Sequence, residues 1–204
     1  MPSNPGLYDA IIPTGISQLK GLKEIITKAE EHCKASDISF DDTIVPARLA
    51  PDMLPLSFQI YIATDLALKI VSRFKDESVP PVGFPADYNT LFATAALIHA
   101  RIDEAIAVLE SCTPEEFEKG EHEEMQWSPR PQIDIRGPKR DYLLAVVVPN
   151  MAFHVTTAYS ILRNRGVQIG KFDILKPFFD TFLPDVNFAG ADVRSRPEEY
   201  KNKE

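Results

Sequence analysis

A regular stripe of apolar residues between positions 91 and 109 constrains the fold more than any other feature of the sequence. The apolar side chains recur at steps of four, three, four, three and four residues: Leu91, Ala95, Ile98, Ile102, Ala105 and Leu109. This spacing places them on one face of an α-helix, the face that a helix buries in a bundle. We predict a helix that begins near Asp87 or Asn89, either of which can cap it, and ends near Cys112.

Three further segments have the same apolar period and complete an all-α, four-helix bundle. The first predicted helix runs from about Leu7 to Ala35, with Pro13 either starting a second piece or kinking its first turns. The second runs from about Pro51 to Lys75, because proline is favoured at the first position of a helix. The last runs from about Lys139 to Arg165 and ends at Gly166, which acts as its C-terminal cap.

The connection between the third and fourth predicted helices has no helical period. Two short runs, Glu123–Trp127 and Gln132–Arg136, flank the turn signal Pro129-Arg130-Pro131. We therefore expect a small two-stranded hairpin that packs on the bundle without forming its core. Beyond Gly170, five phenylalanines are expected to pack back on the bundle: Phe172, Phe178, Phe179, Phe182 and Phe188. The whole chain, 1–204, is expected to form one domain, a comfortable size for a single core.

Charge and cysteine content exclude several classes of protein. Lys and Arg number 22 against 30 Asp and Glu, and the net charge of −8 repels phosphate backbones and anionic lipids. The longest strongly apolar run, Leu143–Val148, is far shorter than the roughly 20 residues of a membrane span. Cys33 and Cys112 have no metal-binding spacing and are typical of free thiols in a reducing compartment. We therefore expect a soluble, cytoplasmic protein with no nucleic-acid or membrane partner.

His154 is a polar residue on the apolar face of the last predicted helix. That face comprises Leu144, Val147, Met151, His154, Ala158 and Ile161. Asn150 lies one turn before His154 on nearly the same face. Pro149 removes a backbone donor inside the helix and obstructs the hydrogen bond one turn back. The resulting kink is expected to turn Asn150 and His154 inward.

A second polar pair, Asp52 and Gln59, lies seven residues apart on one face of the second predicted helix. In a bundle, ligand and metal sites are assembled from inward side chains on facing helices. The candidate pocket is lined by five residues: Asp52, Gln59, Asn150, His154 and Tyr159. His154 is the candidate general base or sole strong metal ligand, Asp52 is its charge partner, and the remaining three bind substrate. The alternative is that the same side chains form a buried hydrogen-bond network without chemistry.

Two motifs carry a resemblance to a known family. Ala47–Leu56 followed by Gln59-Ile60, and Pro149–Arg163 followed by Gly166-Val167, resemble domain-of-unknown-function family nineteen ninety-three, which is grouped with the DinB/YfiT-like metalloenzymes. The resemblance covers about residues 7–171 and leaves 172–204 as a C-terminal extension. It implies a four-helix bundle, often dimeric, and a divalent metal site. That site consists of a histidine on the second helix and a His or Glu one turn before a final histidine on the fourth.

Of these three ligand positions, only the final histidine is matched by a histidine in this sequence, His154. Asn150 stands one turn earlier, and Gln59 or Asp52 stands at the position on the second helix. The resemblance therefore implies a degenerate site for zinc or nickel, since amide oxygens suit these ions poorly. We expect a small-molecule enzyme with such a site. The alternative is a non-catalytic, ligand-binding or dimer-forming bundle. A small-molecule ligand and a second copy of the chain are the expected partners.

Overall fold

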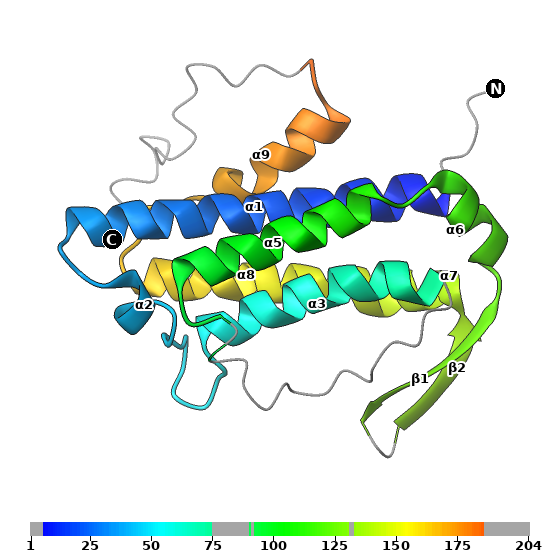
Figure 1. Cartoon of the computed structure of the whole chain (residues 1–204), viewed down its shortest axis with the longest axis horizontal. Coiled ribbons are helices and arrows are strands. Elements are labelled where there is room, and N and C mark those ends of the chain that lie inside the picture. The colour runs from blue at the N-terminus through cyan, green and yellow to red at the C-terminus, as the bar shows by residue number, and fades with distance from the viewer. Residues whose placement is uncertain (1–5, 75–89, 91, 131–132, 186–204) are drawn as a thin grey trace, which may run out of the picture.

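The computed structural model describes residues 6–74, 90, 92–130 and 133–185 of the chain. Four long helices surround a core of buried hydrophobic side chains (Figure 1): α1 (Leu7–Ala35), α3 (Leu56–Phe74), α5 (Ala95–Glu110) and α8 (Val148–Asn164). Each of them packs against two others, in the order α1, α5, α3, α8 and back to α1. The prediction of a mostly helical chain with one small antiparallel hairpin is confirmed.

The first predicted helix is confirmed at both ends, since α1 begins at Leu7 and ends at Ala35. Pro13 lies inside α1, which continues through it, so the prediction of a separate second piece is wrong. Pro13 is the seventh residue of α1, so the helix loses the single hydrogen bond to the carbonyl of Asp9 and continues. A short helix, α2 (Phe40–Thr43), follows α1 and buries Phe40.

The second predicted helix begins later than expected. α3 starts at Leu56, immediately after Pro55, and residues 51–53 form an exposed turn instead of a first helical turn. The Leu56 amide donates to the carbonyl of Ala47 at 2.9 Å, and the Arg48 guanidinium donates to the carbonyl of Met53. These bonds satisfy loop backbone groups without a helix. Pro51 and Pro55 carry the same signal for the start of a helix, and the prediction that the helix begins at Pro51 is wrong.

The apolar face of the third predicted helix is confirmed, because Ile98, Ile102, Ala105 and Leu109 are fully buried on α5. The helix begins at Ala95, with Thr94 as its N-cap in an extended conformation, so the prediction that it begins near Asp87 or Asn89 is wrong. The Thr94 hydroxyl accepts a hydrogen bond from the Leu97 amide at 3.3 Å. The predicted caps, Asp87 and Asn89, and the first residue of the stripe, Leu91, lie outside the described residues.

The predicted hairpin is confirmed between the third and fourth long helices (Figure 1). Its turn comes later than expected, because Pro129 and Arg130 lie in the first strand and Arg130 pairs with Ile133. A short helix leads to it, two strands form it, and another short helix leaves it: α6 (Pro114–Gly120), β1 (Glu124–Arg130), β2 (Ile133–Pro138) and α7 (Lys139–Tyr142). Trp127 packs edge-on against Tyr142, with ring centroids 4.8 Å apart. The ammonium of Lys139, which is only 4% exposed, pairs with Glu123 at 2.7 Å. These two contacts anchor the hairpin to the end of the bundle.

The last helical stretch contains a wide turn just before Pro149. A π-helical turn, η1 (Leu143–Val147), joins α7 to α8, and the Val148 amide donates to the carbonyl of Leu143. The wide turn shifts the buried face by one residue, so Leu143 is fully buried and Leu144 is 43% exposed. The expectation that Leu144 lies in the core is therefore wrong. A cap at Gly166 is confirmed by the positive φ of 87° that ends the helix.

The chain after Gly170 forms a fifth long helix, α9 (Lys171–Phe182), which packs on the outer side of α1 (Figure 1). Lys28 pairs with the buried carboxylate of Asp173. The expected packing of the phenylalanines is only partial. Three of them are half-buried and Phe182 is 48% exposed, while Phe188 lies outside the described residues.

Close contact between α9 and α1 depends on Gly21. A Cβ atom added at Gly21 would lie 2.7 Å from the carbonyl oxygen of Ile174. We therefore expect Gly21→Ala to displace α9 and to cost about 1–3 kcal/mol of folding free energy through overpacking. The better helix propensity of alanine recovers about 0.5–1 kcal/mol of that cost.

The net loss should lower the thermal midpoint by roughly 2–6 °C, as measured by circular dichroism. Gly137→Ala is the matched control, because a Cβ added at Gly137 meets nothing within 4 Å. A Gly21→Ala variant as stable as the wild type would contradict the close contact.

Candidate functional site

Two of the five predicted site residues meet at the interface of α3 and α8. Gln59 on α3 is 4% exposed, and its side-chain oxygen lies 2.7 Å from Nδ1 of His154 on α8. The amide nitrogen of Gln59 also donates to the main-chain carbonyl of Leu54 at 3.0 Å. Gln59 therefore links the loop before α3 to the imidazole of the last long helix.

This chain of hydrogen bonds fixes the tautomer of His154. Because the amide nitrogen of Gln59 donates to a carbonyl, the group facing the imidazole is the amide oxygen, which only accepts. Nδ1 of His154 must then carry the hydrogen and donate it. In the neutral ring, Nε2 is left with an unprotonated lone pair. Within the described residues, Gln59 is the hydrogen-bond partner found for this ring.

Burial lowers the pKa of His154 from its ordinary value of 6.5 to about 4. The ring lies against aromatic side chains, which do not stabilise a buried charge on it as a carboxylate would. Phe58 makes an edge contact with centroids 6.2 Å apart, and Phe153 makes another at 5.3 Å. Phe58 is buried, whereas Phe153 is 59% exposed. At neutral pH His154 is therefore an oriented, uncharged imidazole beside a partly open aromatic surface.

The structure corrects the placement of Asp52. This residue lies in the exposed turn before α3 and shares no helical face with Gln59. Desolvation accounts for the lowered pKa of His154, whereas a carboxylate charge partner would raise that pKa. The partner of Nδ1 is the amide of Gln59, so the predicted pairing of Asp52 with His154 is wrong.

Asn150 and Tyr159 differ in their position relative to His154. Both side chains are half-buried on α8. Asn150 lies one helical turn before His154, about 40° around the helix axis, whereas Tyr159 lies about 140° away. Within the described residues, neither side chain is hydrogen-bonded to His154. Asn150 therefore remains beside the imidazole, and Tyr159 lies on a different side of the helix.

The residues around His154 do not fit a tightly bound divalent metal. No group of three His, Cys, Asp or Glu side chains that could hold a metal is found among the described residues. The oxygen of Gln59 accepts a hydrogen bond from Nδ1, so it lies on the opposite side of the ring from the Nε2 lone pair. A metal ion on Nε2 would therefore have one imidazole ligand where zinc normally takes three or more protein ligands.

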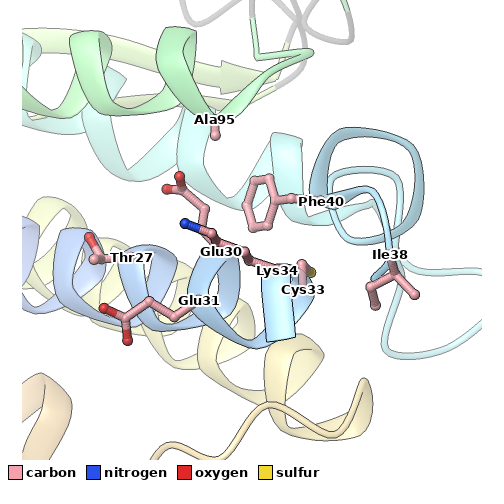
Figure 2. Close-up of a pocket in the computed structure, with 8 residues that line it drawn as sticks. All are labelled: Thr27, Glu30, Glu31, Cys33, Lys34, Ile38, Phe40 and Ala95. Atoms are coloured by element: carbon pink, nitrogen blue, oxygen red, sulfur yellow. The ribbon is translucent and has the colours of Figure 1, made fainter. Parts of the chain in front are cut away.

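A separate shallow pocket of about 440 Å³ lies at the C-terminal end of α1 (Figure 2). Its lining residues come from α1, from α2 and its preceding loop, and from the start of α5: Thr27, Glu30, Glu31, Cys33, Lys34, Ile38, Phe40 and Ala95. Glu30 is also hydrogen-bonded to His99 of α5. None of the five predicted site residues lines it. No apolar repeat in the sequence marks this pocket, because α2 is a single short turn.

Comparison with known proteins supports the family and the fold. Residues 7–175 match the family described as Domain of unknown function (DUF1993), which confirms the resemblance seen in the two motifs. A solved structure of a DinB family member protein from Shewanella denitrificans is similar, with a TM-score of 0.68. The two sequences are 29% identical over 83% of this chain and 91% of that chain. A search of curated proteins finds no match.

The hydrogen bond from His154 to Gln59 predicts the effect of a near-isosteric change. Gln59→Glu places a carboxylate against Nδ1, and an opposite charge at this distance favours the imidazolium. We expect the pKa of His154 to rise from about 4 in the wild type to above 6 in the variant. Imidazole chemical shifts followed by NMR between pH 3 and pH 8 measure both values.

The lowered pKa of His154 in the wild type also makes the free energy of unfolding depend on pH. Because the folded-state pKa lies below the unfolded value, stability is lost as the pH falls from about 6.5 to about 4. This loss amounts to about 2 kcal/mol after allowance for partial exposure of the ring. His154→Gln should remove that part of the pH dependence in urea unfolding. A wild-type pKa near 6.5 would contradict the buried, neutral ring.

The possible metal ligands around His154 also predict how much metal the purified protein contains. After dialysis the purified protein should hold well under one equivalent of zinc or nickel, because one imidazole and amide oxygens bind these ions weakly. Elemental analysis by mass spectrometry provides the measurement, with His154→Ala as the matched control. A stoichiometric metal that survives a chelator in the wild type, and is lost in the variant, would contradict this fit.

Proposed function

This chain belongs to the DUF1993 family, and we propose that it is a soluble, cytoplasmic, small-molecule-binding protein built as one DinB-like four-helix bundle. In this proposal, uncharged His154 accepts a hydrogen bond at Nε2 from an N–H or O–H group of the ligand. The observation that carries the proposal is the orientation of the ring. The side-chain oxygen of Gln59 accepts a hydrogen bond from Nδ1 of His154, so Nε2 of the neutral ring keeps its lone pair. A preorganised acceptor of this kind discriminates strongly among ligands, because an unmatched partner leaves a polar group unpaired.

The surroundings of the ring indicate the class of ligand. Phe58 and Phe153 make edge contacts with the imidazole, and Phe153 is largely exposed. Apolar side chains with a few well-placed polar groups are typical of small-molecule sites. We therefore propose a donor group carried on an aromatic or apolar body. Asn150, one turn from His154, is the second polar residue that this ligand would contact.

The lowered pKa favours binding over catalysis. A general base works best when its pKa lies near the working pH, and His154 has a pKa of about 4. Its lone pair accepts a hydrogen bond at neutral pH, but its affinity for a full proton is low. Of the two functions expected from the sequence, the non-catalytic ligand-binding bundle is therefore better supported than the enzyme.

Phenol is a minimal probe of this proposal, since it carries one O–H donor on an aromatic ring. Phenol should perturb the Nε2 signal of His154 in an imidazole-detected NMR titration, whereas anisole, which lacks the donor, should not. His154→Ala should weaken phenol binding by about tenfold or more, the effect of an unpaired hydroxyl of 1–3 kcal/mol. Anisole should bind both proteins alike.

The response to phenol separates this proposal from a purely structural network. His154→Ala leaves the buried oxygen of Gln59 without its partner, so the thermal midpoint should fall by several degrees in either case. A wild type in which phenol leaves the Nε2 signal of His154 unchanged would assign His154 and Gln59 to a buried network. That result would refute the binding function.

A further inference from the structure

The pocket at the C-terminal end of α1 is separate from the site between α3 and α8, and hydrogen bonds hold its walls in place. Asp37 turns the chain at the end of α1 with a positive φ of 54°. The Ile38 amide donates to the carbonyl of Cys33 at 3.0 Å, which folds the following segment back beside the helix. From α2, the carboxylate of Asp41 accepts a hydrogen bond from the Ala95 amide at 2.9 Å. The pocket between α1, α2 and α5 is therefore preformed.

Glu30 supplies this pocket with a carboxylate that has one oxygen held and one open. Figure 2 shows its side chain reaching from α1 toward Ala95 at the start of α5. Its Oε1 is hydrogen-bonded to Nε2 of His99 on α5, which fixes the direction of the carboxylate. The side chain of Glu30 is 35% exposed, and within the part of the chain that the structure describes its Oε2 has no hydrogen bond. This oxygen can therefore accept a hydrogen bond from a ligand, and a positively charged donor forms the stronger bond.

The charges around the pocket favour a cation. Glu31 adds a second carboxylate, and Lys34 is the one basic side chain among the described residues that line the pocket. The negative end of the α1 dipole lies at the same place. Burial raises the pKa of the Cys33 thiol, and the negative charge of Glu30 raises it further. The thiol is therefore uncharged at neutral pH and belongs to the apolar part of the wall.

We propose that this pocket binds an organic amine cation, whose ammonium group donates to Oε2 of Glu30 while its apolar body lies against Ile38 and Phe40. Ile38 is 39% exposed, so a ligand can reach it. The two carboxylates and one ammonium group of the lining sum to one negative charge, which a singly charged amine neutralises. A volume of about 440 Å³ is within the range of small-molecule sites. This site is independent of the acceptor proposed at His154.

A metal ion fits the same pocket poorly. Among the described residues there is no group of three His, Cys, Asp or Glu side chains that could hold one. Calcium takes six to eight oxygen ligands, and zinc normally takes at least three protein ligands. An ammonium group needs fewer partners, since a single carboxylate oxygen provides a charge-assisted hydrogen bond. The pocket therefore suits an organic cation better than an inorganic one.

Cyclohexylamine, a single cation at neutral pH, tests the proposal against its uncharged analogue cyclohexanol. In an NMR titration of the full chain, cyclohexylamine should cause saturable shifts of the backbone amide signals of Glu30, Cys33 and Phe40. Cyclohexanol should act on these signals with an affinity about tenfold lower, because it lacks the charge. Raising the salt concentration from about 50 mM to about 500 mM should weaken amine binding, since the carboxylate is partly exposed.

Glu30→Gln removes the charge but keeps the shape of the side chain and an oxygen for His99. This variant should bind cyclohexylamine about tenfold more weakly than the wild type. Glu110→Gln is the matched control, because Glu110 is exposed at the far end of α5 and its loss changes the net charge equally. His154→Ala should also bind the amine as the wild type does.

Four results would overturn the proposal. The first is a wild type whose pocket signals do not respond to cyclohexylamine. The second is equal affinity of the wild type and Glu30→Gln for the amine, and the third is cyclohexanol binding at these signals as tightly as the amine. The fourth is loss of amine binding in His154→Ala, which would move the cation to the site between α3 and α8.

Discussion

Pro149 has no amide hydrogen to donate inside a helix, and the register of the whole last helical stretch depends on that absence. The chain accommodates the proline with the π-helical turn at Leu143–Val147, where the Val148 amide reaches back five residues. A π turn takes up one more residue than an α turn, and so it changes which side chains face inward. Leu143 enters the core and Leu144 leaves it. Beyond the turn, the same register brings His154 to Gln59.

The polar contact between α3 and α8 is built from the amide of Gln59 and the imidazole of His154. Gln59 donates to Leu54 and accepts from His154, so its two functional ends are both satisfied while it is buried. Such a satisfied chain tolerates burial because no polar atom loses its partner. It also holds one tautomer of the imidazole. A structural feature of the interface thus produces the chemical property on which ligand binding would depend.

The sequence predicted the long elements well and their irregular junctions poorly. The stripe on α5 and the limits of α1 follow from apolar spacing, which is a local property. The start of α3 does not, because Pro51 and Pro55 carry the same signal and contacts from Ala47 and Arg48 decide between them. The pairing of Gln59 with His154 was within reach of the sequence, since both lie on inward faces. The position of Asp52 could not be predicted from the sequence, because it depends on where α3 begins.

The sequence by itself determined the helices, the hairpin and the family, because hydrophobic period, turn residues and the two motifs are all local in the chain. Tertiary structure decided which polar groups meet and which faces remain open. The partner of Nδ1, and with it the lone pair at Nε2, depends on how α3 lies against α8. The pocket beside Glu30 and the docking of α9 on Gly21 also join segments far apart in the chain. Such contacts depend on packing between elements, which the spacing of residues within one element does not encode.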